Sequence, residues 1–291
     1  MISLTEQARA KVNLTLRVAG RRADGYHDLE SVVAFADCAD SLSLVRGEGP
    51  SLEVTGALAA QCGDLADNLV MRSARRLAEA RAGITSGRFV LDKKLPVAAG
   101  IGGGSADAAA ALRCLARSNG IAIDDPVLYQ VAREVGADVP VCLASRACVM
   151  SGVGDLLAPL ALPRLPCVLV NPRVSVSTVQ VFTALGLARG ERHGDGDAAI
   201  EWPAPGAAAE QWLAVLAAGR NDLEAPAIRI APEIEGVLSA LREAEGVALA
   251  RMSGSGATCF AIFASDAAAE AAAAGLRRKR PQWWVHAGAL S

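Results

Sequence analysis

A glycine-rich segment, Gly100 to Ser105, has four glycines in six residues and leads into an alanine-rich stretch. A loop that enters a helix points its backbone N–H groups and the positive end of the helix dipole into one concavity, which favours phosphate. Glycine has no Cβ, so the backbone can approach the phosphate oxygens closely. No Lys-Ser/Thr pair follows the loop, and Ser105 stands where a dinucleotide-binding pattern has its third glycine. The segment therefore predicts a phosphate cradle of another kind.

A second glycine turn, SGSG at residues 253–256, joins strand-like runs at 247–252 and 258–263. Hairpins commonly take glycine at such a turn. The residues alone leave two interpretations open, an ordinary hairpin turn and a second phosphate-binding turn.

Two polar residues of the first strand could also do chemistry. Apolar and polar residues alternate from residue 8 to residue 18, which predicts a half-buried strand. Lys11 and Asn13 stand at odd positions, so we expect both on the face away from the core, where a lysine is ordinarily solvated. Asp138 lies between a helix end and Pro140, where a turn aspartate with a local hydrogen bond is the alternative to a chemical role.

The pair Tyr26-His27 follows a turn and not an apolar run, although the chain has only 2 tyrosines. An aromatic ring in such a place is a candidate stacking platform for a nucleobase, an interaction that contributes about 1–3 kcal/mol per base.

The elements that must hold these residues follow from periodicity and from turn residues. Helices are predicted at 68–81 behind Asp67 as N-cap, from the glycine loop to Asn119, from Asp125-Pro126 to Gly136, and at 178–185, 207–218, 232–244 and 266–278. Strands are predicted at 29–35, 41–45, 51–55, about 89–91, 167–171, 247–252, 258–263 and 283–288. The order αββαβ at the end of the chain suits an antiparallel sheet with helices on one face.

A stretch rich in Gly and Pro at 151–166 predicts a domain boundary. The two domains are then residues 1–160 and 161–291, and 190–205 is the segment we expect to be most mobile.

The charge balance limits the partners. Lys plus Arg number 29 and Asp plus Glu 31, a net charge of −2, so we expect no nucleic-acid or anionic-membrane partner. The basic run RRKR at 277–280 is typical of a solvated helix end. Apolar runs are too short to span a bilayer, and Glu6 interrupts any signal-like start. We expect a cytoplasmic protein with a small-molecule substrate, and its oligomeric state is left open.

Four ordered motifs resemble those of the GHMP kinases, which include galactokinase, homoserine kinase and mevalonate kinase. They are AKVNLTLRV at 10–18 followed by DGYH at 24–27, PVAAGIGGGSADAAAA at 96–111, GADVP at 136–140 and MSGSGATCF at 252–260. DGYH and GADVP are similar to the branch that phosphorylates a cytidyl-linked alcohol in non-mevalonate isoprenoid biosynthesis. The chain departs from the family pattern at Ala98, Ile101 and Ala106. Because Ala106 stands where the family usually has a second serine, Ser105 is the only hydroxyl left in this loop to help at the phosphate site.

The resemblance implies a catalytic pair, Lys11 and Asp138. A carboxylate can accept the proton of the acceptor hydroxyl, and a nearby ammonium keeps that carboxylate ionised and stabilises the emerging alkoxide. Phosphoryl transfer requires little covalent work from the protein, so positioning and charge stabilisation carry most of the rate.

The resemblance also implies two sets of binding residues. Those at ATP and its phosphates are Pro96, Val97, Ala98, Ala99, Gly100, Ile101, Gly102, Gly103, Gly104, Ser105, Ala106, Asn68, Lys93, Ser253, Gly254, Ser255 and Gly256. Those at the acceptor are Asn13, Tyr26, His27, Thr178 and Phe182. Three have structural alternatives: Asn68 as a helix cap, Lys93 as a solvated lysine and Phe182 as part of the apolar face of its helix.

The implied fold is a two-domain α+β GHMP kinase fold, with an N-terminal α/β ATP-binding domain and a C-terminal ferredoxin-like α+β domain. The implied cofactor is ATP with Mg²⁺, and no metal ligand is firmly assigned, although Ser105 is a candidate. Two alternatives stay open. One is a kinase of the same family that acts on another alcohol, such as homoserine or mevalonate, and the other is a non-catalytic nucleotide-binding regulator.

Overall fold

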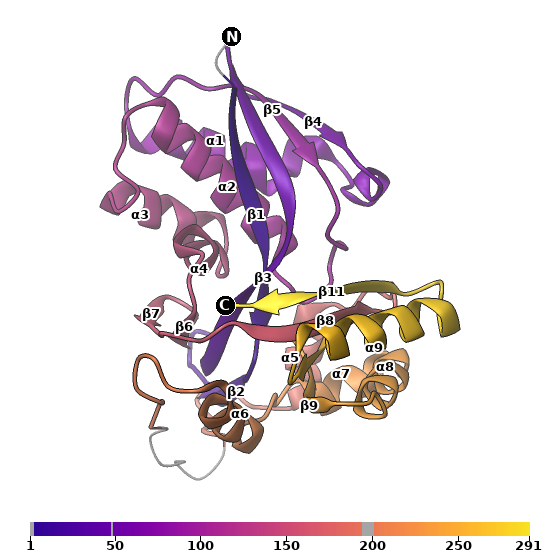
Figure 1. Ribbon diagram of the computed structural model, residues 1–291. Helices are drawn as coiled ribbons and strands as arrows, with labels where there is room; N and C mark the ends of the chain where they lie inside the picture. The colour runs from indigo at the N-terminus through magenta and orange to yellow at the C-terminus, as the bar shows by residue number, and fades with distance from the viewer. Residues whose placement is uncertain (1–2, 48, 194–200) are drawn as a thin grey trace. The chain divides into compact units, whose positions relative to one another are not determined.

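The computed structural model describes residues 3–47, 49–193 and 201–291 (Figure 1). The chain forms two compact units. The first comprises Met1–Ala10, Cys38–Val97 and Gly102–Ser145, and the second comprises Lys11–Asp37, Ala98–Ile101 and Arg146–Ser291. Each unit draws on separate stretches, whereas the predicted boundary after residue 160 cuts the chain once; that boundary stays a prediction. Of the segment 190–205, residues 194–200 lie outside the described residues.

The first unit combines a β-sheet with helices that pack on one another. Strand β5 pairs antiparallel with β3, with Ser41 opposite Asp92, and parallel with β4. Helix α1 packs against α2 and α3, and α4 packs against α2. The elements are β1 (Ser3–Asn13) as far as Ala10, β3 (His27–Arg46) from Cys38, β4 (Ser51–Thr55), η1 (Ala59–Gln61), η2 (Leu65–Asp67), α1 (Leu69–Ala80), β5 (Gly87–Asp92), α2 (Gly103–Ser118), α3 (Pro126–Val135) and α4 (Val139–Ala144).

Local sequence accounts for the helix ends of this unit. The Asp125 carboxylate accepts a hydrogen bond from Val127 N at 3.0 Å and starts α3, which ends at Gly136 as predicted. The N-cap predicted for α1, Asp67, is wrong by one residue. Asn68 Oδ1 accepts from Val70 N at 2.9 Å, and Asp67 closes η2. Both side chains are good caps, so the sequence alone does not separate neighbours.

The second unit contains the chain's ferredoxin-like part. Its final strands are antiparallel in the order β11-β8-β10-β9, with helices in the connections. The last five elements, α8, β9, β10, α9 and β11, follow the predicted order αββαβ. Strand β6 pairs antiparallel with the first half of β3 and also with β7. Strand β2 pairs antiparallel with the first half of β3 as well. The elements are β2 (Arg17–Arg21), β6 (Cys148–Gly152), β7 (Leu156–Pro159), β8 (Leu165–Asn171), α5 (Thr178–Leu185), α6 (Ala209–Ala218), α7 (Glu224–Ile230), α8 (Glu233–Arg242), β9 (Val247–Met252), β10 (Cys259–Phe263), α9 (Asp266–Lys279) and β11 (Trp284–Leu290).

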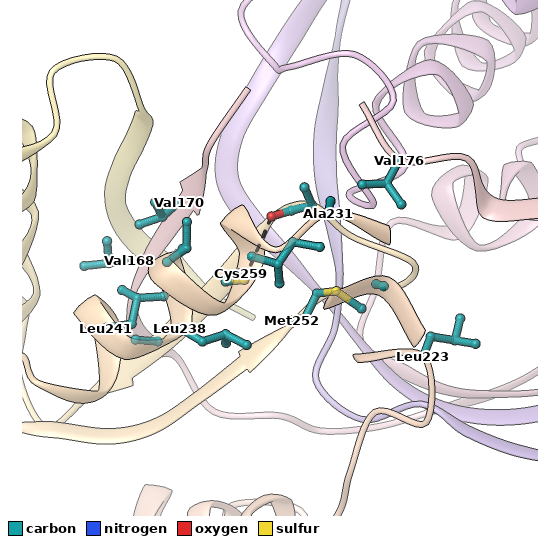
Figure 2. Close-up of a cluster of buried hydrophobic side chains, with 14 of the residues drawn as sticks. Val168, Val170, Val176, Leu223, Ala231, Leu238, Leu241, Met252 and Cys259 are labelled. Atoms are coloured by element: carbon teal, nitrogen blue, oxygen red, sulfur yellow. Dashed lines mark hydrogen bonds between the residues drawn. The ribbon is translucent and has the colours of Figure 1, made fainter. Parts of the chain in front are cut away.

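One hydrophobic core joins this sheet to its helices. Val168 and Val170 of β8 and Met252 of β9 face Leu238 and Leu241 of α8 (Figure 2). Alternate residues of a strand share one face, and residues three or four apart share one face of a helix, so the two apolar stripes meet. The predicted fold class is confirmed, with the helices on one face of the antiparallel sheet.

The first strand differs from its prediction. Residues 8–18 cover the end of β1, a break at 14–16 and the start of β2. The strand breaks because the backbone changes partners: Leu14 N donates to Val32 O, and Leu16 N donates to Arg220 O. The expectation that Lys11 and Asn13 face away from the core was wrong, since both are buried. Alternation identifies two faces of a strand, and here protein covers both.

Some elements carry no clear periodic signal and were not predicted. They are β6, β7, α4 and α7, all short. The runs 29–35 and 41–45 belong to one strand, β3. Its first half forms hydrogen bonds with β6 and its second half forms hydrogen bonds with β5. Among the described residues, no helix is long and apolar enough to cross a bilayer.

Candidate active site

The first glycine loop is built around two left-handed residues. Gly100 has φ 73° and Gly102 has φ 64°, a region that glycine enters at little cost. Gly102 starts α2 without a side-chain cap, so the N–H groups of its first turn face outward along the helix axis toward any anion placed there. Ala98, where the family often has glycine, adopts φ 51°. The backbone at Ala98 thus keeps the glycine-like conformation although the residue has a Cβ.

The second glycine turn, Ser253–Gly256, connects the antiparallel strands β9 and β10 and is buried throughout. It is therefore a hairpin turn, and it also packs against the first loop. Thr258 N donates to Ala99 O at 3.0 Å, and a Cβ on Gly100 would lie 2.6 Å from the carbonyl oxygens of Ser253 and Gly256. Two segments far apart in sequence thus meet backbone to backbone, which is why glycine is required at Gly100.

A buried hydroxyl joins these loops to β1. Ser253 Oγ accepts from Asn13 N at 3.1 Å and donates to Gly100 O at 3.0 Å. Asn221 Nδ2 donates to Met252 O and to Gly254 O, the carbonyls on either side of Ser253. We refer to Asn13, Gly100, Asn221, Ser253 and Gly254 as the Ser253 cluster. Every side chain in it is uncharged.

Asn13 itself is held at its amide nitrogen. Asn13 Nδ2 donates to Ser31 Oγ at 2.7 Å, and Ser31 Oγ donates onward to Thr15 O. Asn13 Oδ1 is buried and has no hydrogen-bond partner among the described residues. An unsatisfied buried acceptor costs about 1–3 kcal/mol. A ligand hydroxyl that donated to this oxygen would remove the penalty.

Lys11 and Asp138 lie in different compact units. Lys11 is buried near the end of β1, and its backbone N donates to Ile101 O at 2.9 Å, so the strand is tied to the first loop. Asp138 precedes α4 and makes no side-chain cap bond to that helix. The alternative predicted for Asp138, a turn aspartate with a local hydrogen bond, therefore stays open beside the catalytic one.

Lys93 is not a solvated lysine. Its Nζ donates to Asp40 Oδ2 at 2.6 Å and to Asp107 Oδ2 at 2.7 Å, and 2% of the Lys93 side chain is exposed. Asp40 Oδ1 also accepts from the backbone N of Lys94 and of Leu95, so it holds the segment that leads to the first glycine loop. We refer to Asp40, Lys93 and Asp107 as the ionic triad.

Burial and charge oppose each other in the ionic triad. Burial raises the pKa of Asp107 to about 7, because the attraction of Lys93 offsets the desolvation of the carboxylate only in part and Asp40 repels it. Burial also disfavours the charged form of Lys93, but the two carboxylates outweigh that cost and raise its pKa. The ammonium therefore stays charged at neutral pH.

Two of the residues predicted around a base, His27 and Phe182, are in contact in the second unit. Their rings are stacked, with centroids 4.5 Å apart and an interplanar angle of 28°, and Tyr26, which precedes His27 in the sequence, is 65% exposed. Burial, and then the charge of Arg21, lowers the pKa of His27, which favours the neutral ring. Phe182 also packs on the core of this unit, so its structural alternative holds as well.

Two other predicted residues have local roles. Asn68 caps α1, as its structural alternative proposed. Thr178 Oγ1 and Ser255 Oγ lie 2.8 Å apart, which connects the start of α5 to the second glycine turn.

Sequence reasoning missed the partners of the predicted residues. Asp40, Asp107, Asn221 and Ser31 are all buried and polar. Asp107 lies directly after the glycine loop, in GGGSAD, and that adjacency was the available signal. Asn221 stands in a short polar run, RND, that nothing in the periodicity distinguishes from a loop.

Comparison with known proteins identifies the family. The model of the GHMP kinases N terminal domain matches residues 68–146, and that of the GHMP kinases C terminal domain matches residues 206–282. A protein of Nitrobacter hamburgensis named 4-diphosphocytidyl-2-C-methyl-D-erythritol kinase is 64% identical over 291 residues, which cover 99% of this chain and 96% of the relative. The chain belongs to the GHMP kinase family.

Solved structures agree with the membership. A crystal structure of 4-(cytidine 5'-diphospho)-2C-methyl-D-erythritol kinase matches with a TM-score of 0.76 and 35% identity over 99% of both chains. Homoserine kinase from Cytophaga hutchinsonii matches with a TM-score of 0.69 and 20% identity, over 98% of this chain and 94% of the other. That second likeness concerns the fold alone. The family resemblance predicted from the four motifs is confirmed.

Membership of the GHMP kinase family implies the use of ATP. The uncapped start of α2 and the left-handed glycines fit phosphate groups. For a metal cation, the described residues offer fewer ligands than they offer for phosphate. Within the described residues, His, Cys, Asp and Glu form no cluster of three that could hold a metal ion. Asp107 is engaged with Lys93, so Ser105 remains the candidate hydroxyl ligand beside the phosphates.

Proposed function

We propose that this GHMP kinase transfers the γ-phosphoryl group of ATP to the 2-hydroxyl of 4-diphosphocytidyl-2-C-methyl-D-erythritol. This is the step of the non-mevalonate route to isoprenoid precursors for which its relative of 64% identity is named. The observation that carries the choice of acceptor is the stacked pair His27 and Phe182, with the exposed Tyr26 next to His27 in the sequence, in the unit that also holds Lys11 and Asn13. A nucleobase needs such a surface, whereas homoserine and mevalonate have no base.

In this proposal the acceptor oxygen attacks the γ-phosphorus, and the bond from that phosphorus to the β,γ-bridging oxygen breaks with the electron pair leaving on ADP. Asp138 accepts the hydroxyl proton, and the Lys11 ammonium stabilises the charge on the attacking oxygen. The unsatisfied Asn13 Oδ1 is a suitable acceptor for a hydroxyl of the substrate. A bound Mg²⁺ would neutralise phosphate charge, with Ser105 as its candidate protein ligand.

The acceptor is tested by measuring ADP formation with the cytidyl substrate, homoserine and mevalonate in parallel. We expect turnover with the cytidyl substrate. Turnover with another acceptor instead would overturn the acceptor assignment. ATP binding without ADP formation from any acceptor would identify a non-catalytic regulator. The cytoplasmic location expected from the sequence remains part of the proposal.

The roles of two residues are tested separately. Asp138→Asn should lower kcat by about 10²–10⁴-fold with an unchanged circular dichroism spectrum, because the base is lost and the shape is kept. A kcat near that of the wild type would exclude Asp138 as the base. Tyr26→Ala should raise KM for the cytidyl substrate far more than KM for ATP. An equal rise in both would exclude stacking on Tyr26.

A further inference from the structure

The side-chain amide of Asn221 uses all of its hydrogen-bonding groups within the second unit. Nδ2 donates to Met252 O at 2.8 Å and to Gly254 O at 2.9 Å, and Oδ1 accepts from Leu223 N at 3.0 Å. The residue is 7% exposed. One acceptor belongs to the peptide bond that precedes Ser253 and the other to the peptide bond that follows Gly254, so the amide holds both ends of the short segment that contains this serine.

Ser253 passes this constraint to two other segments. Its fully buried hydroxyl accepts from Asn13 N and donates to Gly100 O, at 3.1 and 3.0 Å. One hydroxyl thus sets the spacing between the end of β1 and the first glycine loop. Lys11 N, which donates to Ile101 O at 2.9 Å, is a second link between the same two segments.

The packing leaves no room for Ser253 to move independently. A Cβ on Gly254 would lie 2.9 Å from Gly100 O, and one on Gly100 would lie 2.6 Å from Ser253 O. Contacts this close between backbones mean that a displaced Ser253 must displace the glycine loop or β1. The position of Asn13 and Gly100 therefore depends on the Asn221 amide, although Asn221 itself donates to neither residue.

We infer that Asn221 is a positioning residue for phosphoryl transfer, which acts through Ser253 on Asn13 and the first glycine loop. The inference rests on the proposed function. In-line transfer depends on the alignment of the acceptor hydroxyl with the γ-phosphorus, and a misplacement of about 1 Å can cost about 10²-fold in rate. The energy that holds this alignment comes from neutral side-chain-to-backbone hydrogen bonds.

The decisive variant is Asn221→Asp. It keeps the size of the side chain and the oxygen that accepts from Leu223 N, but it places an oxygen opposite the carbonyls of Met252 and Gly254. The chain provides a matched control, Asn119→Asp. Asn119 Nδ2 donates to Thr85 O and Leu115 O, both at 2.9 Å, and its Oδ1 accepts from Thr85 N. Each substitution therefore removes two hydrogen bonds from the side-chain amide to backbone carbonyls and keeps one that the side chain accepts from a backbone N.

We expect Asn221→Asp to lower kcat by about 10–100-fold with a smaller change in KM for ATP, and Asn119→Asp to leave kcat within about twofold of the wild type. Thermal unfolding of both variants shows whether they are folded at the assay temperature. If kcat falls equally in the two variants, or if the kcat of Asn221→Asp stays near the wild-type value, the positioning role is overturned. If Asn221→Asp does not fold, Asn221→Ala, which introduces no charge, takes its place in the same comparison.

A double-mutant cycle with Ser253→Ala tests the route. If Asn221 acts through Ser253, the double variant should lose no more kcat than the more impaired single variant, because residues in one network are not additive. Losses that multiply would overturn action through Ser253.

The wild-type acceptor assay separates this inference from the proposed function. A wild-type enzyme that uses another alcohol overturns the proposed acceptor, and the Asn221 comparison is then made with that alcohol. A wild-type chain that is inactive with every acceptor overturns both.

Discussion

The two buried polar groups of the site regions are built in opposite ways. The ionic triad joins three charged side chains of the first unit, with a net charge of −1 when all are ionised, around one ammonium. The Ser253 cluster of the second unit has no charge, and its hydrogen bonds connect side chains with backbone groups. The ionic triad uses charged groups to hold the segment that leads to the first glycine loop. The Ser253 cluster holds the first glycine loop against the second by close backbone packing.

This difference determines what each group tolerates. A buried charge is stable only while its partners are present, so removing one member leaves an uncompensated charge. The neutral cluster depends on distances, so added volume should damage it more than a change of pH. Three substitutions sharpen the contrast.

The largest effect is expected from Lys93→Met. It leaves Asp40 and Asp107 buried without their cation, and losing one partner of a buried ion pair costs about 3–5 kcal/mol. Urea unfolding measures the loss. The control is Lys94→Met, because Lys94 forms an exposed pair with Asp92 and should show no measurable change. Equal losses in the two variants would contradict the view that burial makes the triad critical.

An intermediate effect is expected from Gly100→Ala in the Ser253 cluster. Gly83→Ala is the matched control, because Gly83 has φ 80° against 73° for Gly100 but has no atom within 4 Å of an added Cβ. Both variants bear the cost of a left-handed alanine, and only Gly100→Ala overlaps backbone. The free energy of unfolding should therefore fall by about 1–3 kcal/mol more in Gly100→Ala. Indistinguishable losses would mean that the two loops can separate without cost.

The third effect is a change in how the free energy of unfolding depends on pH. The pKa of Asp107 is raised from 3.8 to about 7, so between these values the folded state binds more protons than the unfolded state. The free energy of unfolding contributed by Asp107 is therefore highest below about pH 4 and falls as the pH rises to about 7. Asp107→Asn should remove this decline, as measured by urea unfolding from pH 4 to 8.

Ser253→Ala provides the contrast in the same experiment. It removes no titratable group, so its free energy of unfolding should lie below that of the wild type by an offset that does not change with pH. An unchanged slope in Asp107→Asn would show that Asp107 is not the group that titrates in this range.

Local signals were sufficient for much of the secondary structure. Asp125-Pro126 and Gly136 mark the ends of α3, because a capping carboxylate, a proline and a terminal glycine act on the backbone within one turn. Strand β3 was predicted as two runs, since its length comes from hydrogen bonds to β5 and β6, which lie far away in the sequence.

For the site, residue types were predictable and their surroundings were not. Tyr26, His27 and Phe182 were named from motif resemblance as residues around a base, and that role stays a prediction. The structure shows the rings of His27 and Phe182 stacked on each other. Lys93 was also named, but its carboxylate partners stand 53 and 14 residues away and could not be chosen from among 31 acidic residues. The buried state of Lys11 and Asn13 was predicted wrongly, because alternation does not show whether a second layer covers a strand.

The sequence by itself determined the family, the four motifs, the glycine-rich character of both loops and most helix boundaries, because these depend on residues that are neighbours along the chain. The tertiary structure decided that Lys93 is an ion-paired core residue and that Ser253 joins β1 to the first glycine loop. It also decided that Asn221 holds the second loop. Burial and hydrogen bonding at these positions depend on contacts between residues up to 240 positions apart, and no local pattern in the chain encodes them.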